Sequence, residues 1–445
     1  MRITEALGLR RKGGVHPPSR KFTSGRKIER APLPETVILP LEQHVGAPAK
    51  ATVKKGDEVK VGQMIAAAGG FVSAAIHATV SGTVKQLTTV ASPLTGRPVP
   101  GVIIAADGKD EWIELAPVDP KGLSNEEIIA RVQEAGIVGL GGATFPTHVK
   151  LSPPPEARIT SIIVNGAECE PYSTADDRLM QEEPERIIAG LKIVMQLLSV
   201  NRAYIGIEKN KPEAIEQMQR AISAAKAAAS LPPKVTVVAI PAKYPMGATK
   251  TLVQSILGVE VPAGGRAREV GTLVQNVATL AAIYDAVALG KPLVECVVTV
   301  TGLVNEPKNL IARFGTPASL LIELCGGGTH GADTVIFGGP MMGIAQSRCD
   351  TPILKGMSCV ILAKSDIRTE KPCIRCGRCI DVCPMGLMPL QYVKFAQKGD
   401  FDDLADYHIA NCFECGSCAY DCPANIPIVS YIKTGKRELW RQESQ

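Results

Sequence analysis

Two copies of one cysteine pattern near the C-terminus carry the clearest chemistry in this chain. Each copy reads Cys-x2-Cys-x2-Cys-x3-Cys-Pro, the spacing with which proteins hold a pair of [4Fe–4S] clusters. Three closely spaced thiolates bind one cluster, and the fourth, held off by the proline turn, binds the other. We therefore predict one cluster on Cys373, Cys376, Cys379 and Cys422 and a second on Cys412, Cys415, Cys418 and Cys383. Such a chain is expected to carry electrons.

Zinc and disulfide chemistry explain these eight cysteines less well. Tetrahedral zinc sites rarely present four cysteines at this spacing twice over. Disulfides require an oxidising compartment, and the chain shows no secretory segment, so we expect reduced thiols and a cytoplasmic protein. The remaining cysteines are expected to be buried apolar thiols: Cys169, Cys296, Cys325, Cys349 and Cys359.

A glycine-dense loop is the second candidate site. It contains Gly139, Gly141 and Gly142 and ends at Lys150. Glycines let backbone N–H groups approach a phosphate or an isoalloxazine ring, and the lysine adds a positive charge. The loop lacks the G-x-G-x-x-G spacing directly after a strand, so the ordinary dinucleotide fingerprint does not apply. Taken alone, the loop also fits a simple turn.

Length and composition indicate a folded protein of several domains. The chain has 445 residues, of which 45% are hydrophobic and 4% aromatic, and domains usually hold about 100–150 residues. No run of about 18 apolar residues is free of charge, so no transmembrane helix is expected. The nearest candidate, Thr272 to Leu289, contains Gln275, Asn276 and Asp285, and we interpret it as a helix of a water-soluble domain.

Positive charge is concentrated at the N-terminus. Residues 1–30 hold nine Lys or Arg and two Glu, a net charge of +7, whereas the whole chain is +5. A basic arm of this kind can dock an acidic partner or an anionic membrane surface, and a solvated tail is the alternative. Nucleic acid is not an expected partner, because stacking aromatic residues and a recognised binding module are missing.

The pattern of hydrophobic residues divides the chain into parts of different architecture. Residues 35–104 alternate short β-branched runs with turns (strands expected at 36–39, 51–57, 61–65 and 79–84) and resemble a lipoyl- or biotinyl-carrier barrel-sandwich. The hairpin at 69–77 has no lysine, so the carrier function is not expected. Strands and helices then alternate, which predicts a parallel sheet; the helices are expected at 126–135, 185–199 and 212–230 and the strands at 161–164, 203–207 and 235–239. A β-rich unit begins near 294, and a helix is expected at 388–410 between the cysteine runs.

Several sequence motifs together resemble those of a known family. Gly139 to Lys150 matches a G-x-G-G-x-x-F-P-x-x-x-K motif, and Asn165 to Pro171 matches N-x-x-E-x-E-P. Val274 to Ala281 resembles a V-N-N-V-E-T-L-A motif, and residues 244–247 resemble a Tyr-x-x-Gly flavin loop. The sequence at 13–18 is Gly-Gly-Val-His-Pro-Pro. These motifs are similar to those of the flavin-binding subunit of respiratory complex I and, over residues 8–435, to those of the C subunits of Rnf complexes.

The resemblance implies roles for individual residues. FMN would be held by Gly139, Gly141, Gly142, Lys150, Asn165 and Asn276, with Tyr244 and Gly247 in the flavin loop. NADH would contact Phe145 and Glu170, and Glu168 would lie close to the flavin. Thr249 stands where the family commonly has an acidic residue, so a contact from this position to the nicotinamide ribose is not an expectation for this chain.

The expected fold class is multidomain α/β and β. Five parts are predicted: a basic N-terminal arm at 1–34, a barrel-sandwich at 35–118, a Rossmann-like FMN- and NADH-binding α/β domain at 119–292, a β-grasp (SLBB-type) domain at 293–364, and a helical ferredoxin domain with two clusters at 365–445.

The combination implies an NADH-dependent oxidoreductase subunit. A hydride carries two electrons and a cluster accepts one, so FMN is the expected converter. The resemblance implies a peripheral subunit on the cytoplasmic face of the bacterial inner membrane, with other subunits of a cation-translocating complex as partners and ferredoxin as an indirect one. Membrane contact is expected only through those partners or the basic arm. Alternatives are a soluble flavin and iron–sulfur reductase such as a cobalamin reductase, which is expected to begin with its flavin domain, and a ferredoxin-like relay with a vestigial nucleotide domain.

Overall fold

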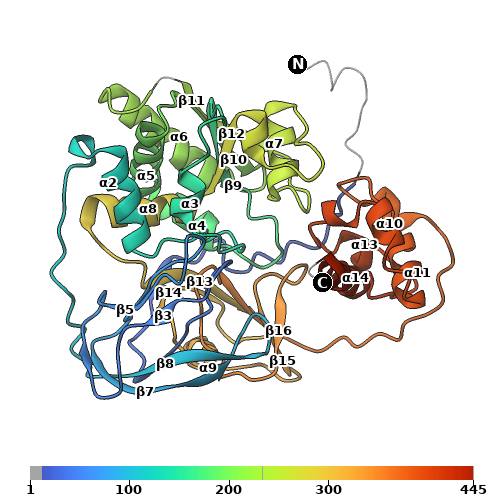
Figure 1. Ribbon diagram of the computed structural model, residues 1–445, viewed down its shortest axis with the longest axis horizontal. Helices are drawn as coiled ribbons and strands as arrows, with labels where there is room; N and C mark the ends of the chain where they lie inside the picture. Colours follow the sequence, from blue (N-terminus) through green and yellow to red (C-terminus); the bar gives the residue numbers. More distant parts are fainter. Residues whose placement is uncertain (1–12, 233, 444–445) are drawn as a thin grey trace.

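The computed structural model describes residues 13–232 and 234–443. An α/β part lies against a β-rich part, and a small helical part that contains the C-terminus stands beside both (Figure 1). The described N-terminal residues pass between these parts as an extended segment (dark blue in Figure 1). The multidomain α/β and β class expected from the sequence is confirmed.

Two small sheets form the barrel-sandwich, with strand orders β2-β8-β7-β4 and β3-β5-β6. The strands are β2 (Thr36–Pro40), β3 (Lys50–Ala51), β4 (Glu58–Val59), β5 (Met64–Ala67), β6 (Ile76–His77), β7 (Gly82–Ala91) and β8 (Pro98–Ala106). Alternate residues such as Val37 and Leu39 are fully buried between the sheets. The strands expected at 51–57 and 61–65 are shorter and shifted, because Gly56 and Gly62 adopt left-handed conformations and turn the chain.

A four-stranded parallel sheet forms the centre of the α/β part, in the order β11-β10-β9-β12. Its elements are α2 (Asn125–Glu134), α3 (Thr147–Leu151), β9 (Ser161–Gly166), α4 (Ala175–Glu182), α5 (Pro184–Leu197), β10 (Arg202–Glu208), α6 (Pro212–Ala227), β11 (Lys234–Ile240), α7 (Thr249–Leu257), β12 (Thr272–Asn276) and α8 (Val277–Leu289), with short 3-10 helices η1 (Pro120–Gly122) and η2 (Ala267–Val270). Helix α2 begins with a capping box formed by Ser124 and Glu127. The predicted strand and helix alternation is confirmed.

One prediction in this part is wrong. The segment at 272–289 is not a single helix, because residues 272–276 form strand β12 and only 277–289 form α8. Strand β12 pairs in parallel with β9, which provides hydrogen-bond partners for its backbone. The Asn276 side chain then accepts hydrogen bonds from the N–H groups of Ala278 and Thr279 and begins the helix.

The β-grasp unit is a six-stranded sheet in the order β1-β14-β13-β17-β15-β16. Its elements are β13 (Glu295–Gly302), β14 (Lys308–Arg313), α9 (Ala318–Leu324), β15 (Thr334–Phe337), β16 (Ile344–Gln346) and β17 (Cys359–Ala363), together with β1 (Ile28–Arg30). Strand β1 comes from the N-terminal segment and pairs in parallel with β14. The segment thus completes an edge of a sheet whose other strands lie far away in the sequence.

Helices lie within and after both cysteine runs of the C-terminal part. They are α10 (Arg378–Asp381), α11 (Pro389–Lys398), α12 (Asp403–Asp406), η3 (Ile409–Asn411), α13 (Ser417–Tyr420) and α14 (Ile428–Glu443). The continuous helix expected at 388–410 is broken after Lys398. Gly399 takes the left-handed conformation that ends a helix, so α12 and η3 continue in new directions.

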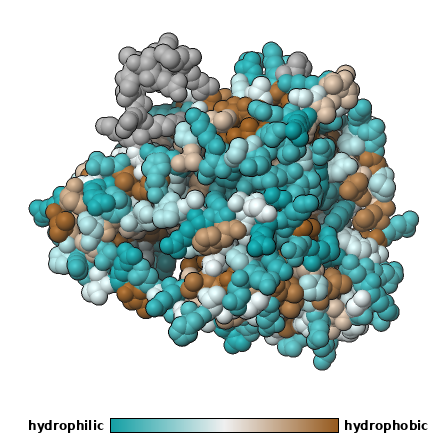
Figure 2. Space-filling view, turned by 180° about the vertical axis from the view of Figure 1, so that it is seen from behind, coloured by the Kyte–Doolittle hydropathy of each residue, from teal (hydrophilic) through white to brown (hydrophobic). Residues whose placement is uncertain are grey.

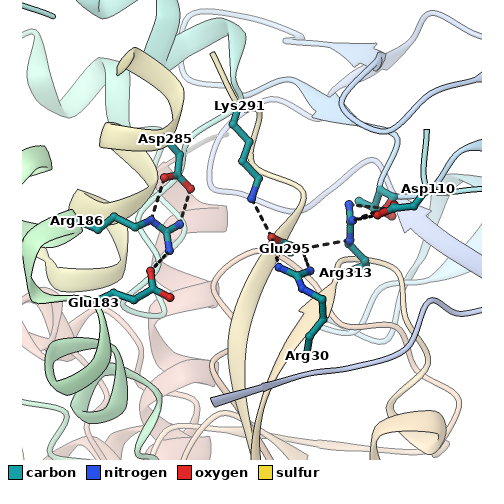
Figure 3. Close-up of polar contacts among 9 residues, drawn as sticks. Arg30, Asp110, Glu183, Arg186, Asp285, Lys291, Glu295 and Arg313 are labelled. Atoms are coloured by element: carbon teal, nitrogen blue, oxygen red, sulfur yellow. Dashed lines mark hydrogen bonds and ion pairs between the residues drawn. The ribbon is translucent and has the colours of Figure 1, made fainter. Parts of the chain in front are cut away.

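Residues 13–30, which we call the strap, connect all of these parts. Its far end carries Arg30, which binds the Glu295 carboxylate of β13 at 2.7 Å (Figure 3). Lys291 and Arg313 bind the same carboxylate at 2.9 and 3.2 Å, and Arg313 also binds Asp110 of the segment after the barrel-sandwich at 2.9 Å. Residues Arg2, Arg10, Arg11 and Lys12 of the predicted basic arm lie outside the described residues.

Within the described ranges, none of the helices combines the length and the apolar character needed to cross a bilayer. The face of the molecule in Figure 2 is largely hydrophilic, with small hydrophobic patches separated by polar residues.

Candidate functional site

Several predicted FMN ligands lie together where the strand order of the parallel sheet reverses. Strands β10 and β11 lie on one side of β9, and β12 lies on its other side. Open α/β sheets bind ligands outside the carboxyl ends of their strands at such a switch point. Asn165, near the end of β9, and Asn276, at the end of β12, are paired in the register of these two neighbouring strands.

The glycine loop covers this point. Hydrogen bonds between Gly139 and Phe145 and from Thr144 to Gly139 close it into a tight turn. Gly141 lies against Asn276, so that a Cβ atom added to Gly141 would be 3.3 Å from the Asn276 Cβ. Gly142 has a φ of +101° and faces open space. The loop tip is exposed while its flanks are buried, which leaves backbone available to a ligand.

Lys150 lies near the end of α3, which follows the loop. Burial lowers the pKa of its ammonium group to about 8. Over residues 13–232 and 234–443 we find no hydrogen bond or ion pair for this ammonium. A desolvated cation without a protein partner is costly, and an anionic ligand would compensate for it. This residue therefore fits a site for the anionic part of FMN.

Asp176 belongs to the same site and was missed in the sequence. Its carboxylate accepts a hydrogen bond of 2.6 Å from the Asn276 side-chain amide. Burial, together with the nearby Glu168 carboxylate, raises the pKa of Asp176 to about 8. The only signal for it was its position shortly after the N-x-x-E-x-E-P motif, where two acidic residues stand together.

Asn165 connects the sheet to the Tyr-x-x-Gly loop. Its side-chain amide donates to the Gly247 carbonyl at 2.9 Å, and its oxygen accepts from the Ala167 N–H at 3.2 Å. The Gly247 N–H in turn donates to the Cys169 sulfur at 3.3 Å. Thr249, the departure from the family pattern, lies at the start of α7.

The two motif glutamates have different surroundings. Glu168 accepts hydrogen bonds from Ser173 and from the N–H groups of Asp176 and Asp177, and so holds the start of α4. Glu170 points the other way, toward the loop between β15 and β16. It accepts hydrogen bonds from the backbone N–H groups of residues 341 and 342, at 3.1 and 2.9 Å. Burial raises the pKa of Glu170 to about 7, although these two hydrogen bonds oppose the shift.

Lys21 of the strap holds the loop that carries both glutamates. Its ammonium donates to the carbonyls of Glu168, Glu170 and Ser173 at 2.9, 2.8 and 2.5 Å. Burial lowers the pKa of this lysine, and the Glu168 carboxylate acts in the opposite direction. The sequence assigned Lys21 to the basic arm, because its neighbours there are also cationic and no motif marks it.

Cys383 of the first cysteine run lies with three cysteines of the second run. Cys383, Cys412, Cys415 and Cys418 line one narrow cavity. Burial raises the pKa of Cys379, and the neighbouring thiols of Cys373, Cys376 and Cys422 raise it further. The backbone N–H groups of residues 375, 387 and 414 point at the sulfurs of Cys373, Cys383 and Cys412 at 3.3–3.4 Å, as is usual around iron–sulfur clusters. In the described part of the chain, no three His, Cys, Asp or Glu surround a point suited to a single metal ion.

The second cysteine set lies directly beside the flavin loop. The Tyr244 hydroxyl donates to the backbone carbonyl of Cys415 at 2.6 Å. Val15, Tyr244 and Cys415 are buried together, and Cys169 and Met341 pack against them. By contrast, Cys373 and Cys376 of the other set are exposed.

Known protein families account for the same four parts. Residues 9–109 match the RnfC barrel sandwich hybrid domain, 132–285 the Nuo51 FMN-binding domain, 297–345 the SLBB domain and 372–426 the 4Fe-4S dicluster domain. The C subunit of the proton-translocating ferredoxin:NAD(+) oxidoreductase complex of Clostridium ljungdahlii is 48% identical over 394 residues, which cover 87% of this chain and 84% of the relative. The chain belongs to the RnfC family.

Two further members of the RnfC family support this assignment. The C subunit of the ion-translocating oxidoreductase complex of Rhodobacter capsulatus is 42% identical, covering 88% of this chain and 76% of the relative. The C subunit of the Na(+)-translocating ferredoxin:NAD(+) oxidoreductase complex of Acetobacterium woodii is 40% identical, covering 88% of both. The cofactors expected from the sequence, FMN and two [4Fe–4S] clusters, are those of the matched domains. The individual ligands of each cofactor remain predictions.

Proposed function

We propose that this RnfC protein moves electrons between NAD(H) and ferredoxin-linked centres of a membrane complex whose other subunits transport ions. The observation that carries the proposal is the direct contact between the flavin loop and the second cysteine set, made by Tyr244 and Cys415. The names of the relatives, ferredoxin:NAD(+) oxidoreductase subunits, agree with it. The barrel-sandwich precedes the flavin domain, which argues against a cobalamin reductase.

FMN exchanges two electrons with a nicotinamide and single electrons with an iron–sulfur cluster. Oxidation of one NADH yields NAD+, one proton and two electrons, which two bound clusters would take up one each. The residues of the chain bind, position and shield the reactants. The glycine loop and Lys150 would hold FMN, and the partly buried Phe145 would offer a ring for stacking on the nucleotide.

Glu170 retains the capacity to bind NADH. A carboxylate has about four acceptor positions, and the N–H groups of residues 341 and 342 occupy two of them. A ribose hydroxyl or a carboxamide could use the others. The same carboxylate would then join the nucleotide to the loop beside the second cysteine set.

The exposure of the cysteines favours one order of electron transfer through the two clusters. The buried set with Cys415 and Cys418 adjoins the flavin loop, whereas Cys373 and Cys376 open to the surface. We assign the first set to the flavin side and the second to the partner side. The partner would be another member of the complex, so that ferredoxin is served indirectly. We place the protein on the cytoplasmic face of the membrane, where NADH is available.

The test is anaerobic purification of the full chain with iron, sulfide and flavin analysis, followed by NADH-dependent dye reduction. We expect about eight iron, about eight sulfide and one flavin per chain. Glu170→Gln should raise the KM for NADH, with a loss of about 1–3 kcal/mol, and leave the flavin content unchanged. Glu156→Gln, at an exposed position, is the matched control.

Two results would contradict the proposal. Clusters without flavin would favour the simple relay. Loss of flavin with an unchanged KM in Glu170→Gln would show that this carboxylate serves FMN and not the nucleotide.

A further inference from the structure

The strap enters the contact between the flavin loop and the ferredoxin domain. The N–H groups of Gly13 and Gly14 donate to the carbonyls of Asp381 and Val382 at 3.1 and 2.7 Å. The next residue, Val15, exchanges two hydrogen bonds with Tyr244, at 2.8 and 3.0 Å. Three consecutive residues therefore bind the ferredoxin domain on one side and the flavin loop on the other.

There is no room for a side chain at either glycine. A Cβ atom on Gly13 would be 2.5 Å from the Cys383 carbonyl oxygen and 2.6 Å from the Pro384 Cα. A Cβ atom on Gly14 would be 2.6 Å from the Tyr244 carbonyl oxygen. The φ angles of +83° and +81° also favour glycine at both positions. These obstacles are backbone atoms, so an added methyl group must push the two parts away from each other.

The other end of the strap cannot move to relieve such a clash. Lys21 is tied to three carbonyls of the motif loop. Thr23 is fully buried against Thr174, and the Asn309 side chain donates to the Thr23 carbonyl. Strand β1 and the Arg30–Glu295 ion pair fix the end (Figure 3). The displacement must therefore fall on the ferredoxin domain.

We propose that Gly13 and Gly14 are spacers that set the distance between the flavin site and the cluster held by Cys383, Cys412, Cys415 and Cys418. This role rests on the proposed function, because it concerns electron transfer from NADH through these sites. Electron transfer slows steeply as the separation of donor and acceptor grows. The spacers would act on this step, and NADH-dependent flavin bleaching, measured separately, shows whether the nucleotide site is also affected.

Gly13→Ala and Gly14→Ala test the proposal in the full chain with its cofactors. Gly25→Ala is the matched control, because it lies in the same strap, has no heavy atom within 4 Å of an added Cβ and is not in the left-handed region. Flavin, iron and sulfide contents are measured first. Rapid mixing with NADH then follows flavin bleaching and cluster reduction separately, and low-temperature EPR identifies the cluster that is reduced.

We expect normal flavin bleaching and slower cluster reduction in both variants. Gly25→Ala should behave as wild type. Hydrogen–deuterium exchange at residues 13–15 and 243–246 should increase in the two variants, because the hydrogen bonds there are lengthened. Wild-type cluster reduction in both, with full cofactor content, would overturn the spacer role. Failure of NADH to bleach the wild-type flavin would instead overturn the proposed function.

If an alanine variant loses iron or flavin, Tyr244→Phe tests the spacer role in its place. It removes the hydroxyl that binds the Cys415 carbonyl and that also acts on the Glu170 carboxylate, so flavin bleaching by NADH is measured beside cluster reduction. Slower cluster reduction together with faster amide exchange at residues 13–15 would support the spacer role. Wild-type values of both would overturn it.

Discussion

Replacing Lys150 by Met should weaken FMN binding and remove its dependence on pH. The ammonium has no protein partner among the described residues, and burial lowers its pKa to about 8. An anion bound beside it would raise that pKa again. A hydrogen bond to a charged group is worth about 1.5–3 kcal/mol, so the dissociation constant should rise roughly 10- to 100-fold in the variant.

The sign of the pH effect follows from the same pKa. Below about pH 8 the lysine of the empty site is already charged, and the affinity should be constant. Above it, the lysine must take up a proton when FMN binds, so affinity should fall by up to about tenfold per pH unit. In Lys150→Met this decline should disappear.

The assay is titration of flavin-depleted protein with FMN, followed by quenching of flavin fluorescence from about pH 7 to about pH 9, on both sides of the lysine pKa. Lys209→Met, at an exposed position outside the site, is the control for loss of a positive charge. Unchanged affinity in Lys150→Met, or a decline with pH that persists in it, would refute the assignment of this lysine to FMN.

Three further predictions address the clusters, the strap and the N-terminus. Cys383→Ala should remove about four iron and four sulfide from the cluster bound by Cys412, Cys415 and Cys418, while the EPR signal of the other cluster persists. Loss of the signal from the Cys373 set alone would show that the crossed assignment is wrong. The control Cys349→Ser should leave both clusters in place. Although burial raises the pKa of Glu295, its hydrogen bond with Arg30 and the neighbouring cations lower it to about 2. At pH values above its unfolded pKa of about 4.5, this carboxylate should therefore contribute on the order of 3 kcal/mol to the free energy of unfolding, and this contribution is lost as the pH falls toward 2. Equal acid unfolding curves for wild type and Glu295→Gln would contradict this. Deleting residues 1–12 should preserve NADH-dependent dye reduction and lower recovery with membranes, most clearly at raised salt, and unchanged recovery across a salt series would leave these residues as a solvated tail.

The parts of the fold that were predictable are those in which local pattern and tertiary structure agree. Alternating β-branched strands and amphipathic helices between 161 and 240 indicated the parallel sheet. At 272–289 the apolar pattern was continuous, and only the neighbouring strand β9 decides that its first five residues are extended. Similarly, Gly399 breaks a helix whose composition is otherwise uniform.

The site was predictable where spacing alone defines chemistry. The eight cysteines have fixed spacings, and the glycine loop with its two asparagines was found through the family motifs. Lys21 and Asp176 were not predictable, because their roles depend on partners about 150 and 100 residues away. A lysine within a basic segment and an aspartate beside another one carry no local mark of burial.

The position of the strap has a consequence for the order of folding. Its partners include the loop at 168–173, Tyr244, Asn309 and the backbone of residues 381 and 382, all of which leave the ribosome long after the strap itself. Domains usually fold as units from the N-terminus during synthesis, but this segment must wait without a partner while the sheets behind it form. The strap is thus made early and docks late. A partner or tag that holds the N-terminus during synthesis would then delay the closure of the whole protein around its cofactors.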